Sequence, residues 1–108
     1  MSNISQRAEF ETERSRSAAF TGSFQTLGTP LTAMPVIAIF DNQSDVDVEV
    51  SDNSTTTWKT FSAGEALVLD FRANHGIASN FTIDVGTQFY VKGTGGTGAF
   101  RLSILSAR

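Results

Sequence analysis

Five acidic side chains lie between positions 41 and 52 of this 108-residue chain and are its clearest candidates for binding chemistry. A calcium ion needs about six to eight oxygens that converge on one point. The acids at 45, 47 and 49 alternate with valines, so they would line one face of a strand without converging. We expect a solvated face with no metal bound, whose mutual repulsion a basic partner surface would relieve. The acids are Asp41, Asp45, Asp47, Glu49 and Asp52.

The segment 93–98, GTGGTG, matches the dinucleotide-binding pattern in its letters only. That fingerprint needs a helix after it and an acidic residue about 20 positions further on. Only ten residues follow here, and they alternate as a strand and contain no acid. We therefore predict a glycine-rich hairpin loop.

Histidine and cysteine chemistry is almost absent. His75 is the only histidine, the chain has no cysteine, and no G-x-S-x-G segment occurs. A disulfide needs cysteines, which the chain lacks, and a zinc site would have no cysteine and no second histidine. A serine-based triad is not indicated, because no nucleophile elbow occurs. The sequence predicts a protein that is not an enzyme, with no catalytic residues and no cofactor.

Trp58 and Tyr90 are candidates for stacking on sugars. Aromatic side chains on the surface of a β-domain can form such a platform, and a carbohydrate- or receptor-binding module is the alternative function that we keep. Tryptophan is highly buried on average, so we expect Trp58 in or beside the core.

The charge pattern speaks against nucleic-acid binding. The net charge is −3, and no basic stripe is visible, since Arg14 and Arg16 lie beside Glu11 and Glu13. The N-terminus has no apolar segment typical of a signal peptide, and no apolar run reaches the length of a membrane span. We expect a soluble protein made in a cytoplasm.

The stretch 34–51 carries the strongest structural signal. An unbroken apolar run at 36–40 is followed by a polar turn and then by strict alternation of valines and acids. Alternation with a period of two puts the valines on one face of a strand. We predict a β-hairpin with one buried face and one exposed face.

The rest of the chain has the same β pattern, with turn residues between short apolar segments and no helical period. We predict a single β-sandwich (a jelly roll or another Greek key) of about eight antiparallel strands over 18–108. Residues 1–17 are polar, so we predict a flexible N-terminal arm. The arm either is a disordered terminus or orders against a neighbouring subunit. The expected strands are 20–25, 36–40, 45–50, 56–61, 67–72, 81–83, 88–92 and 100–104.

Three segments resemble small virion structural proteins of tailed bacteriophages. They are VIAIFDNQSDVDVEVS (36–51), FSAGEALVLDF (61–71) and GTQFYVKGTGGTGAFRLSILSAR (86–108). The shared features are an Asn-containing turn before Asp-Val-Asp-Val, an Ala-Gly loop that leads to a strand ending Asp-Phe, and a closing glycine-rich loop. The likeness covers about two-thirds of the chain and consists of scaffold residues.

The resemblance implies a non-enzymatic capsid decoration (cement) protein, or a neck or tail component, located in the virion. It implies the major capsid protein or another virion protein as partner, a homo-oligomer (a trimer or dimer), and neither nucleic acid nor membrane as partner. The arm and the acidic segment would make the contacts. The candidate interaction residues are Arg7, Phe10, Arg14, Arg16, Asp45, Asp47 and Glu49.

Overall fold

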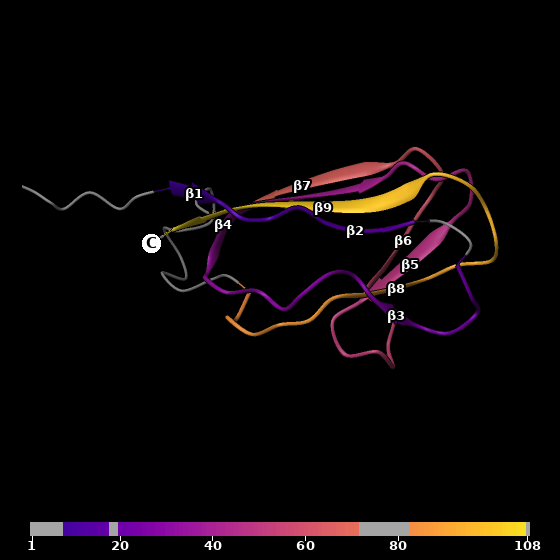
Figure 1. Ribbon diagram of the computed structural model, residues 1–108, viewed down its shortest axis with the longest axis horizontal. Helices are drawn as coiled ribbons and strands as arrows, with labels where there is room; N and C mark the ends of the chain where they lie inside the picture. Colours follow the sequence, from indigo (N-terminus) through magenta and orange to yellow (C-terminus); the bar gives the residue numbers. More distant parts are fainter. Residues whose placement is uncertain (1–7, 18–19, 72–82, 108) are drawn as a thin grey trace, which may run out of the picture.

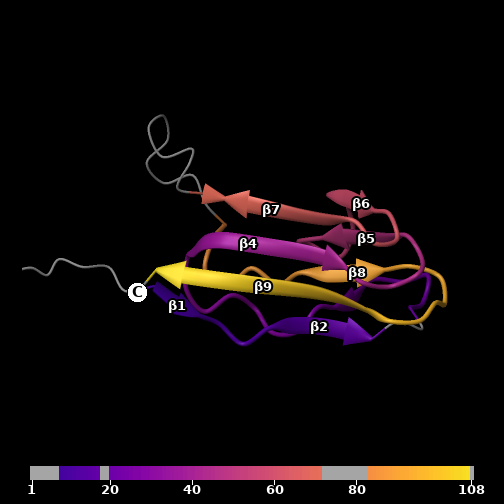
Figure 2. The same ribbon diagram turned by 90° about the horizontal axis from the view of Figure 1, so that it is seen from above.

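The computed structural model describes residues 8–17, 20–71 and 83–107, and this part of the chain is all-β. The described residues form two antiparallel sheets and contain no α-helix. Figure 1 shows the sheets as two layers, and Figure 2 shows the first sheet from above. The strands are β1 (Ala8–Phe10), β2 (Arg14–Ser17), β3 (Gln25–Thr26), β4 (Pro35–Asn42), β5 (Val48–Ser51), β6 (Lys59–Phe61), β7 (Ala66–Asp70), β8 (Tyr90–Lys92) and β9 (Ala99–Ala107).

Strand order differs from chain order in both sheets. The first sheet runs β1-β9-β4-β7, with β2 also paired to β9 along a separate part of that long strand. The second sheet runs β3-β8-β5-β6. Among the strands from β2 onward, only β5 and β6 are consecutive in the chain and also paired. All the remaining connections from β2 onward cross from one sheet to the other. This arrangement places residues far apart in sequence beside each other.

Both sheets contribute alternate side chains to one hydrophobic core, as the period-two pattern predicts. Phe40 and Phe100 of the first sheet and Phe61 of the second are fully buried. The ring centroids of Phe61 and Phe100 are 5.3 Å apart in an edge-to-face arrangement, which aromatic pairs favour. The valines Val48 and Val50 of the predicted alternation are also fully buried, which confirms that they face the core.

The hairpin predicted for 34–51 is wrong. β4 pairs with β7 and β9, whereas β5 pairs with β6 and β8 in the other sheet. Residues 43–47 therefore carry the chain from one sheet to the other. The buried amide of Asn42 holds this connection: its Nδ2 donates to the carbonyl oxygens of Val46, Phe61 and Ser62, and its Oδ1 accepts from Ser44.

The glycine-rich segment 93–98 is also not a hairpin loop. It joins β8 of the second sheet to β9 of the first. Gly98 has φ 93°, and a Cβ there would lie 2.4 Å from the carbonyl oxygen of Gln43, so the loop packs closely against the β4–β5 connection. The segment is followed by the strand β9, whereas a dinucleotide fingerprint is followed by a helix.

Residues 8–17 differ from the flexible arm that we expected over 1–17. Ala8 is paired with Ala107 in the β1–β9 ladder, and Arg14 is paired with Leu102 in the β2–β9 ladder. The physical reason is that the backbone of this segment pairs with β9, while the buried Arg14 is paired with Glu11 and donates to the carbonyl oxygens of Thr29 and Pro30. Residues 1–7, including Arg7, lie outside the described residues.

The first predicted strand is shorter than expected. Phe20 is buried and forms an isolated bridge with Gly95, and regular pairing in this region is confined to β3. The strand predicted for 81–83 falls mostly outside the described residues, as does His75.

Candidate functional site

Asp45 connects two loops at one end of the domain. Its carboxylate accepts hydrogen bonds from the backbone N–H of Thr97 at 2.7 Å and from the Thr97 hydroxyl at 3.0 Å. These bonds stabilise the charged form and lower the pKa of Asp45. Asp45 is exposed, yet its role here is to fasten the β4–β5 connection to the glycine-rich loop.

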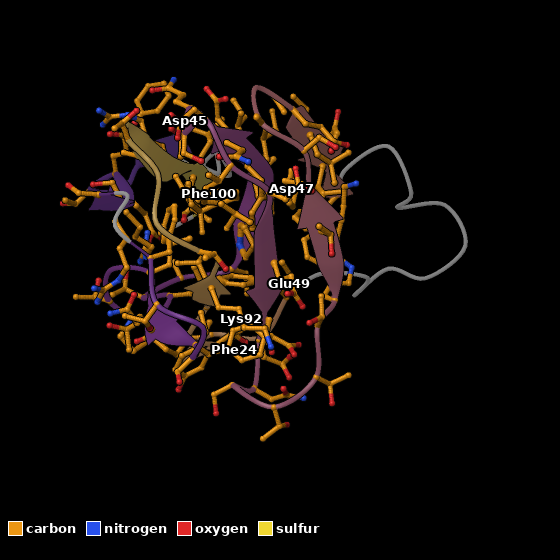
Figure 3. All side chains as sticks on the ribbon, turned by 90° about the vertical axis from the view of Figure 1, so that its right-hand side faces the viewer. Phe24, Asp45, Asp47, Glu49, Lys92 and Phe100 are labelled. Carbon is orange, nitrogen blue, oxygen red and sulfur yellow. The ribbon has the colours of Figure 1, made fainter. Side chains whose placement is uncertain are left out.

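Glu49 finds a basic neighbour within its own chain. Its carboxylate accepts from the Thr57 hydroxyl at 2.6 Å and lies 3.9 Å from the ammonium of Lys92. The same ammonium lies 4.7 Å from the centroid of the Phe24 ring. Figure 3 shows Glu49, Lys92 and Phe24 together on the outer side of the second sheet, away from Asp45.

The three central acids do not share one strand face as predicted. β5 begins only at Val48, so Asp45 and Asp47 belong to the connection and Glu49 alone lies on the strand. Within the described ranges, no three or more His, Cys, Asp or Glu side chains are grouped so that they could hold a metal ion. The same part of the chain contains no helix that would cross a membrane.

The three described candidates of the N-terminal segment lie in different environments. Arg14 is buried, and Arg16 donates from Nε to the carbonyl oxygen of Thr26 at 2.7 Å. Phe10 is 85% exposed and is the most exposed large apolar side chain among those that the structure describes. Arg14 and Arg16 are therefore engaged within the chain, whereas Phe10 points outward.

The outer face of the first sheet carries an apolar stripe, which we call the outer stripe. Cross-strand pairing aligns Phe10 with Leu105, Leu105 with Ile37, and Ile39 with Val68. The residues next to them on β4, β7 and β9 face the core, so these side chains face away from it, and Phe10 lies on the same face as its partner Leu105. Val68 is 59% exposed and Ile39 is 38% exposed. The outer stripe consists of Phe10, Ile37, Ile39, Val68 and Leu105.

Sequence reasoning did not identify the outer stripe. The signal was the unbroken apolar run at 36–40, because a strand without alternation is apolar on both faces. A sheet with one exposed face would normally show polar residues at these positions, whereas here the outer face carries apolar side chains.

Trp58 and Tyr90, the candidates for a sugar platform, are both partly exposed. Trp58 is 46% exposed, and its ring contacts Phe40 at a centroid distance of 5.2 Å. Tyr90 is partly exposed and precedes the fully buried Val91 on β8, which places it on the outer face of the second sheet. Trp58 lies beside the core, as predicted, but at the mouth of a cavity between the sheets.

That cavity, which we call the Trp58 pocket, has a volume of about 160 Å³. Its walls come from both sheets and are aromatic or aliphatic apart from one carboxylate. The lining residues are Phe40, Asp52, Trp58, Leu69, Ile83 and Phe89.

Comparisons of this chain with protein-family models, with curated proteins and with solved structures find no match.

Proposed function

We infer that the two sheets form a single β-sandwich with the strand order of a jelly roll. β1 and β2 count as one interrupted strand because both pair with β9, which gives eight strands in two sheets of four. The first sheet is then ordered first, eighth, third and sixth, and the second is ordered second, seventh, fourth and fifth. Jelly rolls occur in viral capsid and lectin domains, among others.

We propose that the protein is a non-enzymatic structural protein of a phage virion, of the capsid decoration type. It would bind the outer shell, contact the major capsid protein and stabilise capsomer contacts as a homo-oligomer, with N-terminal residues contacting neighbouring subunits. The resemblance supports this proposal, because the matching segments supply β4, β5, β7, β8 and β9 and thus strands of both sheets. Strand order alone does not give a function, so the proposal needs a surface that could assemble.

The outer stripe is the observation that carries the proposal. Contiguous apolar side chains on a soluble domain mark surfaces that bind another molecule. The outer stripe includes Phe10 of β1, so the N-terminal segment and the body of the domain present one continuous face. A flat apolar sheet face suits a broad shell surface better than it suits a small ligand, which needs a concave site.

The test compares two exposed substitutions in purified virions of the phage that encodes the chain. Val68→Asp places a charge on the outer stripe, whereas Thr60→Asp places the same charge on the outer face of the second sheet. We expect wild type and Thr60→Asp in many copies per particle, and Val68→Asp strongly reduced although folded by circular dichroism. Electron microscopy would locate the copies.

The copy number also separates the alternatives. A few copies at one vertex would move the assignment to the neck or tail. Absence from the particle, or equal incorporation of the two variants, would overturn the proposal. Selective binding of the free protein to a glycan array without incorporation would favour a carbohydrate-binding module.

A further inference from the structure

The Trp58 pocket has the dimensions of a small-ligand site. Phe40 and Leu69 contribute from the first sheet, and Trp58 and Phe89 contribute from the second-sheet side. Its volume of about 160 Å³ compares with the roughly 150 Å³ of an apolar cavity that holds benzene. Trp58 is 46% exposed, so the pocket reaches the molecular surface.

Three aromatic rings line the Trp58 pocket. The Phe40 centroid lies 5.2 Å from that of Trp58, with the two rings tilted, and 5.4 Å from that of Phe89, in an edge-to-face arrangement. The faces of aromatic rings carry negative potential and attract cations, and tryptophan does so most strongly. The Trp58 ring is the exposed one of the three, and such a ring beside apolar walls suits a cation with an apolar periphery.

The charge of the pocket agrees with this preference. The exposed carboxylate of Asp52 is the only charged group among the six described lining residues, and none of these six is basic. A neutral apolar ligand would gain nothing from the carboxylate. A sugar would be left with most of its hydroxyl groups without protein partners, which costs affinity. An organic cation uses both the rings and Asp52.

We propose that the Trp58 pocket binds an organic cation of the alkylammonium class, held by the exposed ring of Trp58 and by the carboxylate of Asp52, with the buried Phe40 ring supporting Trp58 from behind. The cation is either a methylated ammonium of a small molecule or the primary ammonium of a partner's lysine. This inference does not depend on the proposed function, since the pocket is separate from the outer stripe.

The full chain contains one tryptophan, so its fluorescence reports directly on the pocket. The probes are choline, its neutral isostere 3,3-dimethylbutanol, and Nα-acetyl-lysine amide, whose side-chain ammonium is free. All are titrated at matched ionic strength. We expect choline to change the emission of Trp58 saturably and to bind about fivefold more tightly than the isostere, the ratio that corresponds to about 1 kcal/mol. Tighter binding of the lysine amide than of choline would identify a partner's side chain as the natural source.

Two matched substitutions test the carboxylate. Asp52→Asn should weaken choline binding about fivefold, the upper value for an exposed ion pair, and leave the isostere unchanged. Asp47→Asn removes the same charge at the other end of β5, roughly 16 Å away at the rise of a strand, and should leave binding unchanged. Trp58→Leu, followed by calorimetry, should abolish choline binding while thermal unfolding shows that the variant is folded.

Four results would overturn the proposal. One is the absence of saturable choline and lysine-amide binding at tens of millimolar. Another is equal affinity for choline and its isostere, because the positive charge of the ligand would then play no part. A third is equal effects of Asp52→Asn and Asp47→Asn, because the Asp52 carboxylate would then play no part. The last is saturable binding of glucose or N-acetylglucosamine in place of the cations, which would assign the pocket to carbohydrate.

Discussion

The guanidinium of Arg14 lies 2.9 Å from the carboxylate of Glu11, and the two side chains are only 4% and 7% exposed. Arg14 also donates to the backbone carbonyl oxygens of Thr29 and Pro30, at 2.7 and 3.0 Å. Glu11 accepts a hydrogen bond from the hydroxyl of Ser106 on β9. The pair therefore fastens the N-terminal segment both to β9 and to the β3–β4 connection.

Replacing Arg14 should cost much of the stability of this small domain. Arg14→Met leaves the Glu11 carboxylate buried without its cation, and breaking one side of a buried pair costs about 3–5 kcal/mol of the free energy of unfolding. Urea denaturation at neutral pH, with the slope checked for two-state behaviour, measures this loss.

Arg101→Met is the matched control. Arg101 pairs with Glu13 at 2.8 Å, but the two side chains are 41% and 46% exposed. We expect a loss of at most about 1 kcal/mol, since solvent screens the pair. Equal and small losses in both variants would show that residues 8–17 do not pack against the domain in solution.

Acid should destabilise the fold through Glu11. Burial by itself raises the pKa of Glu11, but hydrogen bonds from Ser106 and Arg14 and the charge of Arg14 outweigh it, so the pKa lies below its ordinary 4.5. A group whose pKa is lower in the folded state stabilises the fold at any pH above its pKa in the unfolded state. This contribution is lost as the pH falls through the folded-state pKa. The free energy of unfolding should therefore fall below about pH 4.5.

Glu11→Gln tests the assignment of this pH dependence. The variant should be less stable at neutral pH and should decline less steeply in acid, as measured by urea midpoints across the acid range. Hydrogen bonds from Thr97 lower the pKa of Asp45, and those from the Ser62 backbone and Lys59 lower that of Glu65, so some decline will persist. Parallel curves for wild type and variant would exclude Glu11 as a contributor.

The sequence was sufficient to predict an all-β fold and which side chains of several strands face the core. Alternation identified Val48 and Val50 of β5 and Leu102 and Ile104 of β9 correctly, because side-chain direction follows from backbone geometry. Alternation could not identify which strands pair, because without further information strands that are neighbours in the chain are assumed to pair. Here the buried amide of Asn42 directs the chain to the other sheet, and that effect depends on carbonyls brought there by folding.

The candidate site was predicted less well, for a related reason. The sequence predicts Arg14 as an interaction residue of a flexible arm, because its partners Thr29 and Pro30 within the chain are distant in sequence. The acids looked like an exposed row because the start of β5 cannot be read from the alternation, which begins earlier at Asp45. The outer stripe was visible in the sequence, but the apolar run at 36–40 was interpreted only as core.

Substituting Asn42 should disrupt the crossing from β4 to β5. Asn42→Leu keeps a similar volume but removes the amide donor to the carbonyl oxygens of Phe61 and Ser62 and one of the two donors to that of Val46, which also accepts from the Ser44 hydroxyl. Each buried polar group left unpaired costs about 1–3 kcal/mol, so we expect a loss of about 3 kcal/mol or more. Gln43→Ala, at the exposed neighbouring position, should cost about 0.5 kcal/mol or less. Thermal and urea unfolding of both variants measure the difference, and similar losses would contradict the role of Asn42.

Gly98 should tolerate no side chain, because two independent costs coincide there. Its φ of 93° strains any L-residue, and an added Cβ would lie 2.4 Å from the carbonyl oxygen of Gln43 and 3.0 Å from the Cα of Ser44. Strain and overpacking cost about 1–3 kcal/mol each, so Gly98→Ala should lose about 3 kcal/mol or more in urea denaturation.

Gly95→Ala separates the two costs within the same loop. Gly95 also has a positive φ, 61°, but a Cβ there would meet nothing within 4 Å. Only the backbone strain remains, and we expect a loss of about 1–2 kcal/mol. A loss for Gly98→Ala no larger than that for Gly95→Ala would mean that the glycine-rich loop does not pack against the β4–β5 connection. A clearly larger loss would establish that contact, which is the one that Asp45 and Thr97 reinforce from the neighbouring positions.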